Sequence, residues 1–264
     1  GCGRLFGSMP VADIQPTEIQ NATQDESPDI AVLPTDAPNF VAEAASLTYD
    51  PEICKSMRTE SFDEVVEGPD TAFWDVHPAY TAIYCEMTSG GKSAQGVIAI
   101  YPLEQYKLLS SSTAEQVNNL TRILAEHPDL SLMKELPFMP IPNTQQMFHI
   151  QDAYLTLPNA NGIRYLTQHS QGFMAVANDT LYYTFQGIST DDGYLITAQF
   201  PVGHASLPAE GLVLNDDFQA FVDNFAEYLS STTAGLNAQP LESFIPDITK
   251  LDAMIQSMII ESQG

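Results

Sequence analysis

The clearest pattern of hydrophobic and polar positions lies in residues 182–202, YYTFQGISTDDGYLITAQFPV. Two runs rich in Tyr, Phe, Ile and Thr flank the turn 190–193, which predicts a β-hairpin. Side chains alternate between the two faces of a strand, so we expect one polar, uncharged face and one core face with Tyr183, Phe185, Tyr194, Ile196, Ala198 and Phe200. Gly193 is expected to supply a positive φ, while Asp191 and Asp192 turn the chain rather than do chemistry.

Further segments have the pattern of strands. Residues 80–85 carry apolar side chains on both faces, which is typical of a buried strand. Residues 97–103 predict its antiparallel neighbour, with residues 89–96 as a loop between them. Residues 146–158 and 162–170 predict two strands around an NANG turn. With the hairpin, these two make a meander of four consecutive strands.

Three segments repeat apolar residues at helical spacing. Ser112 and Glu115 have the capping-box pattern at the start of a helix over 113–126. A second helix is expected after a cap at Asn215 and a third after Asp247; their apolar stripes are Phe218, Phe221, Val222, Phe225 and Leu229, and Ile248, Leu251, Ile255 and Met258. This order of elements predicts an α+β fold, an antiparallel β-sheet of five or more strands with about three packed helices.

The start of the sequence differs in composition from the rest. Residues 1–39 are rich in Pro, Asp, Glu, Thr and Gln, which predicts a disordered acidic tether, and residues 40–264 are expected to form a single α+β domain. Cys2, which follows Gly1, has the context of the lipidated cysteine of a bacterial lipoprotein. A cloning remnant or a truncated reading frame is the alternative. The lipid-anchor interpretation predicts an extracytoplasmic protein, secreted and held at the cell membrane.

Charge limits the partners. The chain has 34 Asp plus Glu against 9 scattered Lys plus Arg, a formal net charge of -25. Nucleic acid is excluded as a partner, because its recognition needs clustered basic residues, and contact with a membrane is expected only through the lipid anchor. The acidic surface is commonly a solubilising one, with a cationic partner or Ca²⁺ as the alternative.

Two cysteines remain, Cys54 and Cys85. Outside the cytoplasm such a pair can oxidise, so a disulfide between them is one interpretation, although the sequence does not determine their distance. A catalytic thiol would need a nearby His and positive surroundings. Neither cysteine has a basic neighbour beyond Lys55.

The polar strand face is the candidate ligand site. If strand 162–170 adds its basic and amide groups to those of the hairpin, the sheet presents one cation amid amides and hydroxyls: Arg164, Gln168, Thr184, Gln186, Thr197 and Gln199. Such a surface suits a small polar or anionic ligand. The alternatives are a solvated face or one covered by a helix. Arg164 is expected either to pair with Asp152 on the adjoining strand or to point into the pocket.

No pattern of a known reaction is present. The sequence lacks H-E-x-x-H, G-x-S-x-G, G-x-x-x-x-G-K-[ST], G-x-G-x-x-G and C-x-x-C, and its five histidines have no zinc-site spacing. We therefore assign no catalytic residue and expect no cofactor or metal. The expected function is a non-catalytic binding module for a small ligand or a protein partner. A hydrolase whose site is assembled only in three dimensions, or a structural or assembly factor, is the alternative.

Several phrases together carry a resemblance: RYLTQ, YTFQG and the DDGY turn, within a match over about residues 62–260. The chain resembles an uncharacterised family of secreted or lipid-anchored bacterial proteins, which implies location but no reaction. The closing LDAMIQSMII also resembles the last helix of PsbP-like domains, which implies an α/β sandwich. The Pro-rich residues 127–142 depart from that second pattern.

Overall fold

A computed structural model of the protein describes residues 37–89, 92–211 and 218–261. Its centre is a seven-stranded sheet in the order β3-β4-β5-β9-β8-β7-β6, in which every neighbouring pair is antiparallel. The strands are β3 Ser56–Phe62, β4 Tyr80–Ser89, β5 Lys92–Pro102, β6 Gln145–Leu157, β7 Ala160–Ser170, β8 Tyr182–Ser189 and β9 Tyr194–Pro201. The expected meander is confirmed as β6 to β9.

Shorter elements surround this sheet. One three-stranded sheet joins β1 Phe40–Val41, β2 Ala45–Leu47 and β12 Ile259–Ile260, and β10 Gly203–His204 pairs with β11 Phe244–Ile245. The 3-10 helices are η1 Phe73–Asp75, η2 Leu130–Leu132 and η3 Leu241–Ser243. The α-helices are α1 Leu103–Lys107, α2 Ser111–Glu126, α3 Phe218–Asp223, α4 Phe225–Asn237 and α5 Ile248–Gln256.

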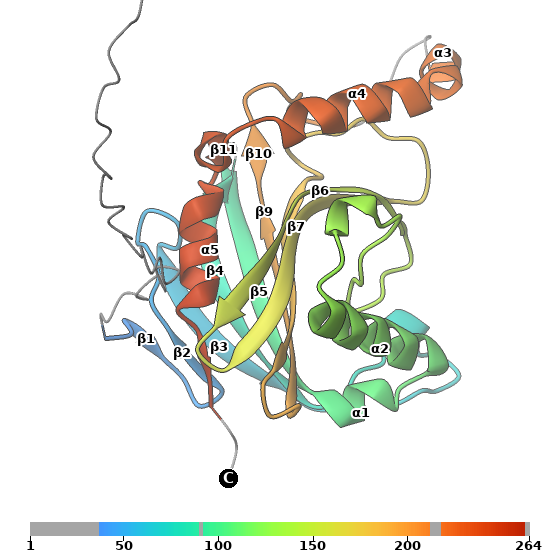
Figure 1. Cartoon of the computed structure of the whole chain (residues 1–264). Helices are drawn as coiled ribbons and strands as arrows, with labels where there is room; N and C mark the ends of the chain where they lie inside the picture. Colours follow the sequence, from blue (N-terminus) through green and yellow to red (C-terminus); the bar gives the residue numbers. More distant parts are fainter. Residues whose placement is uncertain (1–36, 90–91, 212–217, 262–264) are drawn as a thin grey trace, which may run out of the picture. The chain divides into compact units, whose positions relative to one another are not determined.

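Helices cover both faces of the large sheet. In Figure 1, α5 lies along one face and α1 and α2 lie over the other. Each face therefore has its own core, because apolar side chains point both ways from the central strands. The α5 face includes Leu166, Tyr183, Phe185, Ile196 and Phe200. The α2 face includes Ala99, Tyr101, Ile163, Tyr165 and Leu195. The expected α+β fold with an antiparallel sheet and packed helices is confirmed.

The hairpin has the predicted register. Tyr183 lies opposite Phe200 and Phe185 opposite Ala198, and all four are buried. The turn differs in one detail, since the positive φ of 56° belongs to Asp192 rather than to Gly193. Asp tolerates this left-handed conformation better than most residues. The neighbouring Asp191 carboxylate accepts hydrogen bonds from the Ser189 hydroxyl and the Gly193 N–H, so it holds the turn.

Three boundaries differ from the predictions. The cap of α2 is Ser110, whose hydroxyl accepts the Thr113 N–H while the Thr113 hydroxyl accepts the Ser110 N–H; Ser112 and Glu115 lie inside the helix. The expected loop over 89–96 is mostly strand, because β5 begins at Lys92. The second predicted helix is divided into α3 and α4 at Asn224. Its expected cap, Asn215, lies outside the described residues.

Cys2 and residues 1–36 of the predicted tether also lie outside the described residues. Within the described part, the Asn39 side chain bonds both the N–H and the C=O of Tyr49. The last residue of the expected tether is thus attached to the folded part. Among the described residues, no helix combines the length and the apolar character needed to cross a membrane.

Candidate functional site

Arg164 does not point into a pocket. Its side chain is buried on the α5 face of the sheet and donates from Nε and Nη2 to the two carboxylate oxygens of Asp252, at 3.1 and 2.9 Å. It also donates to the backbone carbonyl of Gln151. Asp252 in turn accepts a hydrogen bond from the Tyr183 hydroxyl at 2.9 Å. The arginine is therefore part of a buried network that joins α5 to the sheet.

The prediction that Arg164 pairs with Asp152 is wrong. Asp152 binds His149 Nδ1 at 2.9 Å, and His149 Nε2 contacts the Met133 carbonyl. A bulge between Ile150 and Ala153 shifts the register here, so Asp152 lies on the face opposite Arg164. Burial lowers the pKa of His149, but Asp152 and the Met133 carbonyl outweigh that effect, and the net pKa is raised.

The six predicted ligand residues do not form one surface. Tyr165 lies opposite Thr184 in the register, and Ile163 lies opposite Gln186. Thr184, Gln186, Thr197 and Gln199 therefore share the α2 face, whereas Arg164 and Gln168 lie on the α5 face. A shift of one residue in a strand moves a side chain to the other face, and the prediction joined residues of opposite parity.

The chain itself covers most of this polar face. Gln186 is fully buried and binds both the N–H and the C=O of Met139, at 3.0 and 3.1 Å. Thr184 and Thr197 are also buried, and the Tyr165 hydroxyl donates to the Pro137 carbonyl. On the opposite face, Gln168 is buried and occupied with Thr180 and Ala175. The Pro-rich segment thus fills the place that a polar ligand would take.

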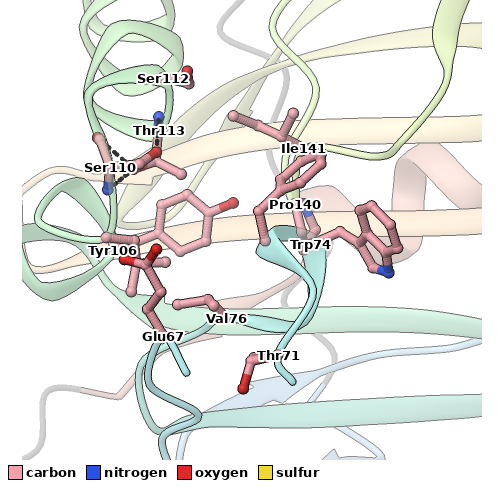
Figure 2. Close-up of a pocket in the computed structure, with 12 residues that line it drawn as sticks. Glu67, Thr71, Trp74, Val76, Tyr106, Ser110, Ser112, Thr113, Pro140 and Ile141 are labelled. Atoms are coloured by element: carbon pink, nitrogen blue, oxygen red, sulfur yellow. Dashed lines mark hydrogen bonds between the residues drawn. The ribbon is translucent and has the colours of Figure 1, made fainter. Parts of the chain in front are cut away.

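A pocket opens beside this cover, between the loop over 67–76, the α1–α2 junction and the Pro-rich segment. Its volume is about 320 Å³. Seven lining side chains are apolar or aromatic, four are Ser or Thr and one is a carboxylate: Phe73, Trp74, Val76, Tyr106, Leu109, Pro140, Ile141, Thr71, Ser110, Ser112, Thr113 and Glu67. Figure 2 shows Tyr106 facing Pro140, with the Trp74 indole beyond Pro140 and the Glu67 side chain reaching toward Tyr106.

A second pocket of about 450 Å³ shares Trp74, Pro140 and Ile141 with the first. Its other lining residues are Phe138, Pro142, Asn143, Thr167, His169, Tyr182 and Gln199. We call the two pockets together the aromatic groove. Among the six predicted ligand residues, Gln199 is the one that lines it.

A stack of aromatic rings supports one wall of the groove. Phe62 on edge strand β3 stacks on Tyr80, Tyr80 on Tyr101, and Tyr101 packs against Tyr106, with centroids 4.8, 4.6 and 5.0 Å apart. Tyr106 is 2% exposed. Burial raises its pKa, and the backbone of Ile141 opposes part of that rise. Tyr106 is therefore a fixed, neutral wall.

The Ser and Thr hydroxyls of the first pocket are of two kinds. Those of Ser110 and Thr113 are used by the capping box. Those of Thr71 and Ser112 make no hydrogen bond with any described residue and remain available to a ligand. Two rings at the mouth are exposed, Phe73 at 61% and Trp74 at 46%. Large exposed aromatic side chains beside a pocket are typical of a binding surface.

The described residues bring two imidazoles close to hydroxyls. Thr144 lies 3.5 Å from His169 Nδ1, and Ser206 lies 2.7 Å from His204 Nδ1. Neither histidine contacts a carboxylate within the described ranges. Burial lowers the pKa of His169 to about 4, which makes it a weak base at neutral pH. The same ranges contain no group of three His, Cys, Asp or Glu side chains that could hold a metal ion.

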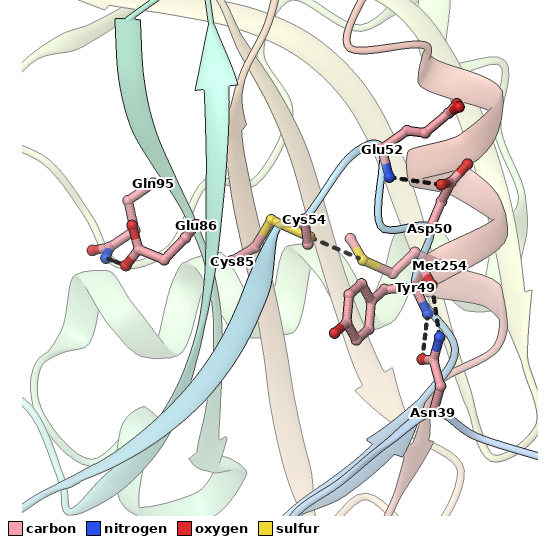
Figure 3. Close-up of a disulfide and its surroundings, with 9 residues drawn as sticks. All are labelled: Asn39, Tyr49, Asp50, Glu52, Cys54, Cys85, Glu86, Gln95 and Met254. Atoms are coloured by element: carbon pink, nitrogen blue, oxygen red, sulfur yellow. Dashed lines mark hydrogen bonds between the residues drawn. A yellow bond between two sulfur atoms is a disulfide. The ribbon is translucent and has the colours of Figure 1, made fainter.

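Cys54 and Cys85 form a disulfide between the loop before β3 and strand β4 (Figure 3). Both are fully buried. The Cys54 sulfur lies 3.9 Å from the Met254 sulfur of α5. The bond therefore packs inside the α5-face core and does not contribute to the aromatic groove.

Sequence reasoning missed the groove residues Glu67, Trp74, Tyr106 and Ile141. They come from a loop, a helix and a Pro-rich segment without a shared periodicity, so no pattern joins them. One signal was available. Trp74 is the single tryptophan of the chain and lies in an acidic run with Phe73 before it. An aromatic pair between charged residues is typical of an exposed loop that binds something.

Comparison of the chain with models of protein families, with curated proteins and with solved structures gives no match.

Proposed function

We propose that the protein is a non-catalytic binding module and that the aromatic groove holds its ligand. The observation that carries the proposal is the groove itself: a half-enclosed, mainly apolar cavity with a fixed tyrosine wall and an exposed tryptophan at its mouth. Ligand sites are concave and apolar with a few polar groups that orient the ligand. Thr71 and Ser112 supply such groups.

The location proposed from Cys2 agrees with this function. A lipid-anchored domain outside the cytoplasm can capture a small molecule or a partner without entering the membrane. The buried disulfide between Cys54 and Cys85 supports an oxidising compartment.

Binding can be measured directly, because Trp74 is the single tryptophan of the chain. Titration with a neutral apolar fluorophore, N-phenyl-1-naphthylamine, should quench Trp74 emission and increase probe emission by energy transfer. We expect saturable binding with one site. Absence of saturable energy transfer would contradict the proposal.

Two neighbouring leucines provide a matched pair of variants. Leu109 lines the groove, whereas Leu108 is 84% exposed and does not. Leu109→Gln should weaken probe binding, by about tenfold if roughly 1.4 kcal/mol of apolar contact is lost. Leu108→Gln should leave it unchanged. Equal effects of the two changes would place the probe elsewhere.

A further inference from the structure

We infer that the ligand of the aromatic groove is an organic cation, with a positive charge on an apolar body, as in an alkyl- or arylammonium. This inference deepens the proposed function and rests on it. The polar or anionic ligand expected for the sheet face does not fit, because the Pro-rich segment fills that face and Arg164 lies on the opposite face, paired with Asp252.

The loop that forms the groove mouth is strongly acidic. Five carboxylates lie between residues 63 and 75, and no Lys or Arg lies among them: Asp63, Glu64, Glu67, Asp70 and Asp75. None of these side chains makes an ion pair or a hydrogen bond with a described residue. Their charge is not neutralised within the fold, so the loop presents a negative field at the mouth.

The residues that line the two pockets also carry negative charge. Among the described residues that line the two pockets, Glu67 is the one with a formal charge, since His169 is neutral at pH 7 and none of them is Lys or Arg. Arg58, the last base before the loop, pairs with Glu60, and Lys107, which follows the lining residue Tyr106, pairs with Glu104. An anionic ligand would meet repulsion without a compensating base.

The chemistry of the walls favours an organic cation over a metal ion. No three acidic, Cys or His groups converge in the described ranges, whereas Ca²⁺ needs six to eight oxygens. The Trp74 ring, which is 46% exposed at the groove mouth, offers an electron-rich face that attracts ammonium groups. The groove therefore combines apolar contact, one accessible aromatic face and one carboxylate, Glu67.

The test compares two probes of nearly equal shape, benzyltrimethylammonium and its neutral analogue neopentylbenzene. Both are titrated into the wild-type protein at low salt with Trp74 fluorescence as the readout. We expect the cation to bind about 3- to 30-fold more tightly, the range that cation–π contact supports. Added salt should reduce this preference.

Glu67→Gln should remove much of the preference and leave neopentylbenzene binding unchanged. The control is Glu227→Gln on α4. This substitution changes the net charge by the same amount, but Glu227 does not line the groove. The variant should keep the preference for the cation. Trp74→Leu removes the fluorescent reporter, so its binding is measured by calorimetry. Of the three variants, it should weaken binding of the cation most.

The outcomes separate the two proposals. Equal binding of the two probes, or tighter binding of the neutral one, overturns the cation inference and leaves the groove as a binding site. Loss of preference in Glu227→Gln as large as in Glu67→Gln overturns the assignment of Glu67. Failure of both probes and of N-phenyl-1-naphthylamine overturns the binding site itself.

Discussion

Arg164 shows how one residue can be a functional candidate in sequence and a structural element in the fold. Its side chain is 4% exposed, and all three guanidinium nitrogens donate hydrogen bonds, two to the Asp252 carboxylate and one to the Gln151 carbonyl. A buried charge is costly unless it is paired. Burial and the charge of Asp252 raise the pKa of the Tyr183 hydroxyl, so that group remains a donor. The network is fully satisfied and leaves no cation for a ligand.

Arg164→Met should therefore destabilise the protein. Loss of the guanidinium leaves Asp252 buried beside Tyr183 without its cation, which costs about 3–5 kcal/mol of unfolding free energy. Urea denaturation measures this change. Arg164→Met combined with Asp252→Leu should recover part of the loss, because no unpaired charge remains.

The double variant is the control for this prediction. If Arg164→Met alone changes the unfolding free energy by less than about 1 kcal/mol, well below the cost of a broken buried pair, the ion pair does not hold α5 on the sheet. Binding of the groove probes should be unchanged in both variants, since Arg164 and the groove lie on opposite faces.

At the scale of elements, the disulfide connects the loop before β3 to β4. Its cysteines are 31 residues apart in sequence, and the bond also contacts Met254 of α5. The cross-link therefore restrains three elements of one core. Its main effect is to limit the conformational freedom of the unfolded chain. This stabilising effect is larger when the loop that the bond closes is longer.

Replacing both cysteines with alanine should lower the unfolding free energy by roughly 3–4 kcal/mol, the value expected for a loop of this length. Alanine avoids a new buried polar group. Chemical denaturation of the oxidised wild type against Cys54→Ala/Cys85→Ala gives the difference. Wild type measured with a reductant present throughout should lose a similar amount of stability; an unchanged midpoint in the double variant would contradict the expectation.

Local patterns determined the elements well. The register of the β8–β9 hairpin follows from alternation around a short turn, and α5 begins after Asp247 as expected, with the Asp247 carboxylate accepting the Thr249 N–H. Such features depend on residues a few positions apart. The capping box lies two residues before the predicted position, at Ser110 and Thr113, because several hydroxyls precede α2 and the local sequence does not distinguish between them.

At the scale of the whole molecule, the site could not be predicted in the same way. Arg164 and Asp252 are 88 residues apart in sequence, and Met139 and Gln186 are 47 apart. No local pattern encodes these pairs. The groove depends on a Pro-rich segment whose position over the sheet follows from packing. The sequence therefore shows which residue types are present, but it does not show which of them come together in the groove.

The proposed location gives a prediction for the complete precursor. Expression with its native upstream segment in a bacterial host should yield a protein that incorporates a palmitate analogue and partitions with membranes, through Cys2. Cys2→Ala should lose both properties, while probe binding in the groove stays the same. Equal labelling of the two proteins would contradict the lipid anchor.

The outer edge of β3 has a consequence for self-association. Strand β3 ends the sheet and is largely exposed on both faces. Arg58 on this strand pairs with Glu60 at 3.0 Å and lies over the Tyr84 ring. A strand from another molecule that added to this edge would have to dehydrate both charges. The exposed edge thus carries its own protection against growth of the sheet into aggregates.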